Sequence, residues 1–517
     1  MNASPSLRLK PLAACLAAAL AIMPAAALLS DRAHAAVRST ADVATRRAGI
    51  APTIAMAIDH RGVPSLAEMM HAAADRARAA QPAPNRPAGV TLVTSCDDAG
   101  PGTLRDALTN AISGDTVDMS GLACGTISLT TGAISTTADD VMLKGPGASA
   151  LTIDAGSQSG IVNHYGAGTL TIEDLTLTNG HIEGQEFHGG ACVLSAANVV
   201  VNDSTLSNCY AYMGHAYGGA ICAVGNVTLS HSTLSGNTTK GHYYYYYYQG
   251  YPNPYLINGT SWGGGAYAAG RFTITDSTIT HNRAEMNNRG SVGGGIAAGA
   301  SGHLISGSTF DGNAAWLGGG IDILGDFGGE PYGLTIVDST ISGNESFASG
   351  AGVGTFYMAY VNLHNSTVTG NAAGYYCGGV YVYYGNADIE SSIIAGNTSV
   401  YDHNQFGYYS AADLDVFSGD ATISGGHNVI MTSNAPTPPD TLIDDPLLLP
   451  LADNGGPTMT HAFDLTSVVL DAGSNPDGLA FDQRGEGYPR VTGEGADIGA
   501  FEAPGAIPDA IFANGFD

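Results

Sequence analysis

Short runs in which apolar and polar residues alternate recur along most of the chain. Val227-Thr228-Leu229 and Phe272-Thr273-Ile274 are two of them. A period of two places the apolar side chains on one face of a β-strand, and each run is too short to form a sheet of its own. The pattern therefore predicts many short strands that are stable only when they stack on one another.

Internal repeats indicate how these strands stack. A Ser-Thr pair followed by an apolar residue recurs between Ser204 and Ser392, degraded in the last copy, and the successive serines are 28, 45, 31, 31, 27 and 26 residues apart. The spacing of 45 marks an insertion in one repeat. A repeat of about 28 residues with three short strands is typical of one coil of a parallel β-helix. The sequence therefore predicts an all-β fold, a right-handed parallel β-helix solenoid.

An asparagine stands five residues after each of these serines except the first, which has Cys209 there. We expect this position at a sharp bend, because Asn tolerates left-handed backbone geometry and its amide can hydrogen-bond to the next Asn in a ladder. Because every coil uses the residue in the same way, a structural role is favoured over a catalytic one. The predicted structural ladder consists of Asn237, Asn282, Asn313, Asn344, Asn371 and Asn397.

Each repeat also carries a glycine pair or triplet, such as Gly263-Gly264-Gly265. Glycine allows positive φ and close backbone approach, so we place these residues at another corner of the coil. The open ends of such a stack need caps. Residues 102–112 predict an N-terminal capping helix, because Thr103 and Asp106 resemble a capping box and Leu104 and Leu108 belong to an apolar stripe.

The N-terminal part of the chain differs from the repeats. Residues 1–35 predict a secretory signal peptide, with basic Arg8 and Lys10, an apolar run and an Ala-His-Ala cleavage site. No later stretch reaches the ~20 apolar residues of a transmembrane span. Residues 36–89 form an Ala/Arg-rich leader, in which a helix is expected from Ser65 to about Ala80 before a Pro-rich linker. Its apolar face would hold Leu66, Met69, Met70 and Ala73. A pro-segment, a docking helix and a loosely attached leader are alternatives, of which the last is favoured.

Six cysteines remain after the expected cleavage. An even number in an exported chain permits disulfides, and Cys96 with Cys124, which flank one local unit, are the best candidate pair. The pairing of the other four is left open by the sequence. No C-x-x-C spacing supports a metal or redox site. The open set is Cys192, Cys209, Cys222 and Cys377.

Charge narrows the choice of partners. The 517 residues carry 18 Lys and Arg against 46 Asp and Glu, a formal net charge of −28. Ten of the basic residues but only five acidic ones precede Pro87, so the part from Pro87 onward has a charge near −33. Nucleic-acid binding needs clustered cations, so we do not expect this chain to bind nucleic acid. Tight binding of polyanionic polysaccharides is disfavoured for the same reason.

Two sets of motifs resemble known families. Gly218-Gly219-Ala220-Ile221 and Phe310-Asp311-Gly312-Asn313 are similar to the repeats of chlamydial polymorphic outer membrane proteins. The stretch Leu451-Ala452-Asp453-Asn454-Gly455-Gly456-Pro457-Thr458, followed by Asp482-Gln483-Arg484-Gly485 and Asp497-Ile498-Gly499-Ala500-Phe501-Glu502, resembles the choice-of-anchor Q domain of bacterial secreted β-helix proteins. The resemblance implies export to the extracellular space or the outer-membrane surface of a Gram-negative bacterium, with no established chemistry.

The resemblance completes the expected domain organisation. A parallel β-helix over 90–400 precedes a choice-of-anchor Q-like region over 401–505 and a tail over 506–517, which is similar to short tails of exported proteobacterial proteins. The polymorphic proteins carry a translocator barrel at the C-terminal end. The residues after the predicted solenoid show no series of ten-residue alternating strands, so no autotransporter barrel of its own is expected here.

The insertion in the long repeat contains the candidate binding residues. Six consecutive tyrosines cannot all be buried in one strand, and an exposed aromatic loop can stack on sugar rings or adhere to a surface. The candidate ligand-binding residues are Tyr243, Tyr244, Tyr245, Tyr246, Tyr247, Tyr248 and Trp262. A low-complexity loop packed on the solenoid wall is the alternative. Cell-surface glycans or proteins are the expected partners.

Enzymatic chemistry is the competing hypothesis, because β-helix proteins include polysaccharide lyases and hydrolases. A glycosidase needs two carboxylates ~5–9.5 Å apart. Asp311, Asp322, Asp326 and Glu330 are candidates, but no motif singles out a pair, so no catalytic residue is assigned. No cofactor is expected. Ca²⁺ is the weaker alternative, because the calcium-binding nonapeptide repeat is absent from the sequence. The sequence thus favours a non-enzymatic adhesion or interaction protein, with a carbohydrate-active enzyme as the alternative.

Overall fold

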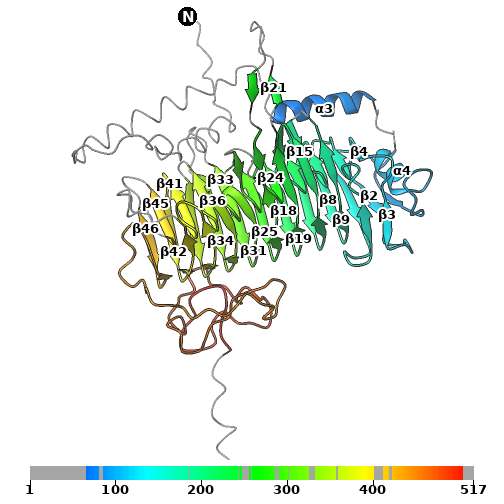
Figure 1. Cartoon of the computed structure of the whole chain (residues 1–517). Coiled ribbons are helices and arrows are strands. Elements are labelled where there is room, and N and C mark those ends of the chain that lie inside the picture. Colours follow the sequence, from blue (N-terminus) through cyan, green and yellow to red (C-terminus); the bar gives the residue numbers. More distant parts are fainter. Residues whose placement is uncertain are drawn as a thin grey trace, which may run out of the picture.

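The predicted short strands stack into a parallel β-solenoid of about nine turns in the computed structural model of the chain (Figure 1). The structure describes residues 66–80, 86–184, 187–242, 244–246, 255–257, 259–285, 290–300, 302–324, 332–356, 359–400, 412–417 and 422–504. The predicted signal peptide and the tail lie outside these residues. The predicted all-β class and β-helix architecture are confirmed.

Two sheets, A and B, run the length of the solenoid, and each coil contributes one strand to each sheet. Sheet A contains β1 (Val90–Leu92), β2 (Asp115–Asp118), β5 (Val141–Lys144), β8 (Thr169–Glu173), β13 (Asn198–Asn202), β18 (Val227–Ser230), β25 (Phe272–Thr275), β30 (His303–Ser306), β34 (Tyr332–Val337), β38 (Ala359–His364), β42 (Asn386–Glu390) and β46 (Ile423–Gly426). Sheet B contains β3 (Thr126–Ser128), β6 (Thr152–Asp154), β9 (Thr176–Thr178), β14 (Thr205–Ser207), β19 (Thr233–Ser235), β26 (Thr278–Thr280), β31 (Thr309–Asp311), β35 (Thr340–Ser342), β39 (Thr367–Thr369), β43 (Ile393–Ala395) and β47 (Val429–Ile430).

Sheet C forms the third wall, and sheet D is built from excursions of the chain between sheets B and C. Sheet C contains β4 (Ile134–Thr136), β7 (Val162–His164), β12 (Val193–Ser195), β17 (Ile221–Ala223), β24 (Ala266–Ala268), β29 (Ile296–Ala298), β33 (Ile321–Leu324), β37 (Val353–Phe356), β41 (Val380–Tyr383) and β45 (Leu414–Phe417). Sheet D contains the outgoing strands β10 (His181–Glu183), β15 (Tyr210–Met213), β20 (Thr238–Gly241), β27 (Arg283–Ala284), β32 (Ala314–Leu317), β36 (Glu345–Ser349), β40 (Ala372–Ala373) and β44 (Thr398–Ser399), and the returning strands β11 (Phe187–Gly189), β16 (His215–Tyr217), β23 (Ser261–Trp262) and β28 (Ser291–Val292).

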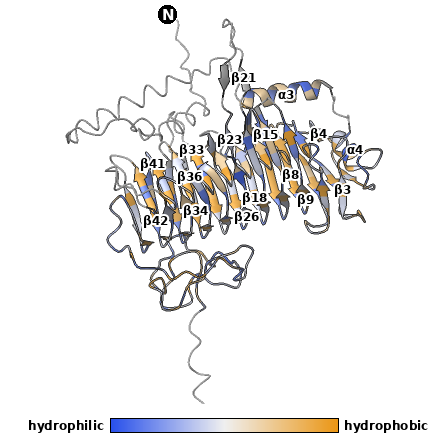
Figure 2. Cartoon of the chain, in the orientation of Figure 1, coloured by the Kyte–Doolittle hydropathy of each residue, from blue (hydrophilic) through white to orange (hydrophobic). Residues whose placement is uncertain are grey.

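The register places like residues above one another. Between β18 and β25, for example, Val227 lies opposite Phe272 and Leu229 lies opposite Ile274. These inward side chains are fully buried and form one continuous core along the solenoid. Figure 2 shows the hydrophobic positions gathered in the stacked strands. Since each coil alone buries little apolar surface, stability depends on the contacts between neighbouring coils.

The predicted N-terminal cap is present. Helix α4 (Leu104–Thr109) begins after Thr103, whose side chain accepts a hydrogen bond from the Asp106 amide, and Asp106 accepts one from the amide of Gly102. Leu104 and Leu108 are buried against the first coils. The helix closes this end of the core, as its capping box and apolar stripe indicated.

The left-handed bend lies one residue earlier than expected. None of the ladder Asn residues has positive φ; the residues before them do, among them Gly236 (φ 64°), His281 (φ 53°) and Gly312 (φ 63°). The expectation that the Asn itself occupies the left-handed position was wrong, because its amide serves as an inward hydrogen-bonding group instead. The glycine corner is as predicted: Gly263 has φ 63°, and a Cβ atom there would collide with the carbonyl of Ala266 at the start of β24.

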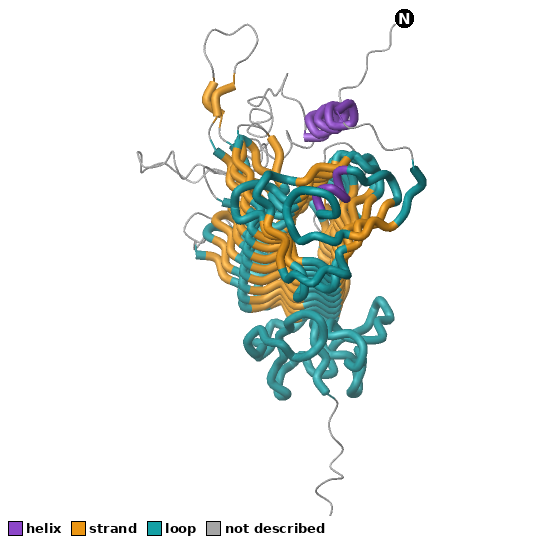
Figure 3. The backbone as a smooth tube through the Cα atoms, turned by 90° about the vertical axis from the view of Figure 1, so that its right-hand side faces the viewer, coloured by secondary structure: helices purple, strands orange, loops and turns teal. Residues whose placement is uncertain are grey.

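The C-terminal segment lies along the side of the solenoid. The stack continues through β45, β46 and β47 to Ile430, beyond the predicted boundary at residue 400. Residues 434–504 contain only isolated bridges and pack against sheet B (Figures 1 and 3). Thr309 donates a hydrogen bond to the Met459 carbonyl and Thr340 donates one to Gln483, both at 2.6 Å. This region therefore covers a face of the coils rather than only their last turn.

Candidate functional site

The predicted Asn residues form one buried row of amides along the solenoid. Each Nδ2 donates a hydrogen bond of 2.9–3.0 Å to Oδ1 of the next Asn, and each backbone N–H donates to the same oxygen. The row ends at Asp413, whose Oδ1 accepts from Asn397. Burial raises the pKa of Asp413 despite these bonds. Because the side-chain amides of the ladder are hydrogen-bonded to one another and buried, they have no access to a substrate.

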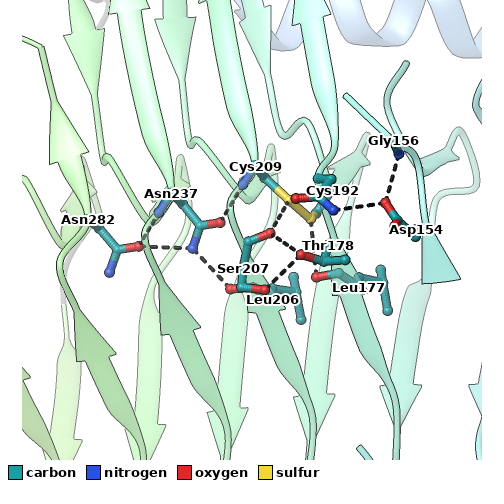
Figure 4. Close-up of a disulfide and its surroundings, with 11 residues drawn as sticks. Asp154, Gly156, Leu177, Thr178, Cys192, Leu206, Ser207, Cys209, Asn237 and Asn282 are labelled. Carbon is teal, nitrogen blue, oxygen red and sulfur yellow. Dashed lines mark hydrogen bonds between the residues drawn. A yellow bond between two sulfur atoms is a disulfide. The ribbon is translucent and has the colours of Figure 1, made fainter. Parts of the chain in front are cut away.

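Cysteine begins the same row (Figure 4). The amide of Cys209 donates to Oδ1 of Asn237, and the Cys209 sulfur is bonded to Cys192. The predicted Cys96–Cys124 disulfide is also present. The remaining cysteines, Cys222 and Cys377, are buried and free. Two disulfides are consistent with folding in an oxidising compartment.

The tyrosine insertion leaves the solenoid as a hairpin. Strand β21 (Tyr244–Tyr246) pairs antiparallel with β22 (Tyr255–Ile257), and the pair projects away from the coils between β20 and β23 (Figures 1 and 3). Tyr243, Tyr247 and Tyr248 lie outside the described residues, as do the side chains of Tyr244, Tyr245 and Tyr246. The hairpin places the backbone of Tyr244–Tyr246 on a projection, not in a strand of the core.

Trp262 is not the exposed aromatic residue that the sequence suggested. Its side chain is 4% exposed, and its Nε1 donates to the Thr260 hydroxyl at 2.8 Å. Its ring lies 5.9 Å from that of Tyr217 and 6.0 Å from that of Tyr267. Trp262 was assigned to the loop surface because it follows the insertion, but the returning strand β23 brings it back against sheet C.

These three rings, named here the aromatic trio (Tyr217, Trp262 and Tyr267), belong to a second hydrophobic cluster outside the coil. We call it the outer cluster. It forms because sheet C is apolar on both faces: in β17, Ile221 and Ala223 face the core while Cys222 faces outward. The outward row of sheet C consists, in register order, of Leu194, Cys222, Tyr267, Ala297, Asp322, Gly354, Tyr381 and Asp415.

Helix α3 (Leu66–Ala80) packs on the outer cluster. Leu66, Met70 and Ala74 are at most 5% exposed, while Met69 and Ala73 are half-buried beside them. The expected helix and its apolar face are therefore present, and the helix is docked on the solenoid wall. The favoured expectation of a loosely attached leader was wrong for residues 66–80, because the apolar stripe of the helix finds an apolar surface on the outer side of sheet C.

Asp322 is the anomalous residue of the outward row. It is fully buried, and neither carboxylate oxygen has a hydrogen-bond partner among the described residues. Burial raises the pKa of Asp322 well above its ordinary value, because desolvation disfavours the charged carboxylate. Burial also raises the pKa of Asp415 to about 7.

The two acids of the outward row, Asp322 and Asp415, lie too far apart for a glycosidase pair. Asp322 and Asp415 are three strands apart in sheet C, about 14 Å at ~4.8 Å per strand. The hydrolytic geometries need ~5–9.5 Å. Asp311 lies on sheet B, and Asp326 and Glu330 are outside the described residues. The Lys240 ammonium forms an ion pair with Glu285 at 2.8 Å. Within the described ranges, no group of three His, Cys, Asp or Glu side chains could hold a metal ion.

The C-terminal motif residues hold the lateral segment in place. The buried Arg484 guanidinium bonds Asp482 and lies 3.9 Å from the Phe501 ring centre. Gln483 donates to the Thr309 hydroxyl at 3.0 Å on the solenoid. Arg490, which the sequence analysis did not single out, donates to the carbonyls of Gly499 and Asp497 and lies 3.4 Å from Asp338. These contacts indicate that the motif residues hold the C-terminal segment on the solenoid.

One sequence signal would have revealed the outer cluster. The sheet C strands Ile221-Cys222-Ala223 and Ile296-Ala297-Ala298 are apolar throughout, whereas the sheet A and sheet B strands alternate with Thr and Ser. Continuous apolar strands are typical of sheets buried on both faces.

No family model, curated protein or solved structure matches the chain. The resemblances to the choice-of-anchor Q domain and to the polymorphic outer membrane proteins therefore stay predictions. Over the described residues, no helix has both the length and the apolar character needed to span a bilayer.

Proposed function

We propose that this chain is an exported surface or extracellular interaction protein that binds cell-surface glycans or proteins without transforming them. The observation that carries the proposal is the hairpin β21–β22, in which Tyr244–Tyr246 form a strand that projects beyond the coils. Aromatic rings bind sugars by stacking and need no catalytic partner. The charge near −33 from Pro87 onward favours neutral glycans, because polyanions are repelled.

The second candidate is a carbohydrate-active enzyme. The buried Asp322 is the observation that favours it, because burial raises the pKa of this carboxyl and a carboxyl that keeps its proton can act as a general acid. Against it stands the distance to Asp415, which is too long for either glycosidase geometry. Binding without turnover is therefore the better supported function.

The test replaces Tyr243–Tyr248 with serine in the full chain. Wild-type and variant proteins are compared for binding to a panel of neutral glycans and to whole cells, with reducing ends and unsaturated products measured in parallel. The matched control replaces Tyr360 and Tyr384, two exposed tyrosines elsewhere on the solenoid. We expect wild-type binding that the serine variant loses and the control keeps. Unchanged binding by the serine variant would reject the tyrosine loop as the binding site. Sustained product formation would favour the carbohydrate-active enzyme.

A further inference from the structure

We propose that helix α3 is a releasable cover over the aromatic trio, and that separating α3 from the solenoid exposes these rings as a second binding surface. The use of that surface for a ligand rests on the proposed function. The cover itself rests on the contacts of α3 alone.

The position of α3 follows from its two ends. Near the C-terminal end, Arg78 donates to the Tyr165 carbonyl at 3.1 Å, beside β7. Leu66 lies twelve residues earlier, about 18 Å along a helix at ~1.5 Å per residue. At ~4.8 Å per strand this distance spans three to four strands of sheet C, from β7 to the neighbourhood of β24. Helix α3 lies beside β11, and β11 pairs with β16, the strand that ends at Tyr217 of the trio. The N-terminal half of α3 therefore points along the wall toward the coil that contains Trp262.

The hold of α3 on the solenoid is mostly apolar. Its stripe of Leu66, Met70 and Ala74 is buried in the outer cluster. The ion pair of Arg78 with Asp139 is 3.7 Å long and about half exposed, so water and salt weaken it. A helix of 15 residues is marginal on its own in water. Once released, α3 would lose its helical structure and would not rebind tightly.

A break in the chain between α3 and the solenoid would leave α3 held by its own contacts alone. On the solenoid side, Arg86 forms an ion pair with Asp115, and Asp115 also accepts from the amides of Gly89 and Ile112. These bonds fix the chain from Arg86 onward. The five residues 81–85, between Ala80 and this anchor, include Pro82 and Pro84. After a single cut there, only non-covalent contacts hold α3 on the solenoid, and the anchored chain stays in place.

The two tryptophans of the chain allow a direct test. Trp316 is replaced with phenylalanine in the full chain, so that Trp262 is the single tryptophan, and residues 81–85 are replaced with a site-specific protease sequence. Trp262 fluorescence, its quenching by acrylamide and the binding of anilinonaphthalene sulfonate are measured before and after cleavage. Size-exclusion chromatography then shows whether the N-terminal fragment stays on the solenoid.

We expect the fragment to separate, the Trp262 emission to shift to the red, and quenching and dye binding to rise. Met70→Asp in the uncut chain should produce the same changes, while Ala72→Asp, on the exposed face of α3, should not. A fragment that co-elutes with the solenoid, with unchanged quenching after cleavage, would overturn the cover. If Trp262 becomes exposed but soluble β-glucan, mannan and galactan bind no better, the cover stands and the ligand role of the trio is rejected.

Discussion

Asn313→Ala removes one member of the buried amide row and tests its energetic weight. Asn313 Oδ1 accepts from the backbone N–H and the Nδ2 of Asn282, and its own Nδ2 donates to Asn344 and to the Ile279 carbonyl. The substitution leaves the Asn282 N–H and the Ile279 carbonyl buried without these partners. Each such group costs about 1–3 kcal/mol, so we expect the free energy of unfolding to fall by about 2–6 kcal/mol.

Urea unfolding followed by circular dichroism measures the total loss. Hydrogen exchange locates it, because coils that contact only their neighbours open locally. The matched control is Asn163→Ala, in a half-buried position on β7, for which we expect a change within about 0.5 kcal/mol. Asn313→Asp keeps the acceptor and loses the donor, so acid should restore part of its stability. A cost for Asn313→Ala no larger than for the control would refute the reasoning.

Three further predictions concern buried acids, the C-terminal segment and a disulfide. Burial raises the pKa of Asp322 in the folded protein above its ordinary value of 3.8, so between these two pKa values the folded protein keeps a proton that the unfolded chain releases, and stability falls as pH rises. Asp322→Asn should flatten this part of the pH dependence of the melting temperature. An unchanged slope would contradict the prediction. Arg490→Ala should cost about 3–5 kcal/mol and speed proteolysis of residues 434–504, because it leaves buried acids and carbonyls unpaired. Replacing Cys96 and Cys124 with serine opens a loop with a sequence separation of 28 residues and should cost about 2–4 kcal/mol, seen as earlier thermal unfolding of the N-terminal coils.

The repeat pattern was sufficient to predict the coil, but not the excursions of the chain that form sheet D. Ser204 and the later serines define the register, and their spacing predicts stacked strands whatever follows between them. The excursions that form sheet D vary in length from coil to coil and have no fixed spacing. Trp262 was misplaced for this reason, since sequence neighbours of an insertion can return to the body of the fold.

Local motifs were reliable where the physical cause is itself local. Thr103 and Asp106 cap a helix through contacts within one turn, so their spacing is sufficient evidence. The pairing of Cys192 with Cys209 depends on which coils are adjacent, and among four open cysteines the sequence allows several pairings. Asp413 was missed as the end of the amide row, because its position breaks the spacing from Ser to Asn.

The position of α3 illustrates the same limit. Its stripe of Leu66, Met70 and Ala74 indicates a packed face, but any apolar surface would satisfy the pattern. The surface that it contacts exists only once sheet C has folded with apolar residues on both faces. Such long-range complementarity does not show in the spacing of residues.

The central claim, binding without turnover, is tested most directly by isothermal titration calorimetry of the full chain with a soluble neutral polysaccharide that it retains. Binding alone gives heat pulses that decay to baseline and saturate with added ligand, with no new reducing ends in the cell afterwards. We expect this result for the wild type and its loss when Tyr243–Tyr248 are replaced with serine. A steady heat that persists after each injection, together with accumulating products, would contradict the account and identify the chain as an enzyme.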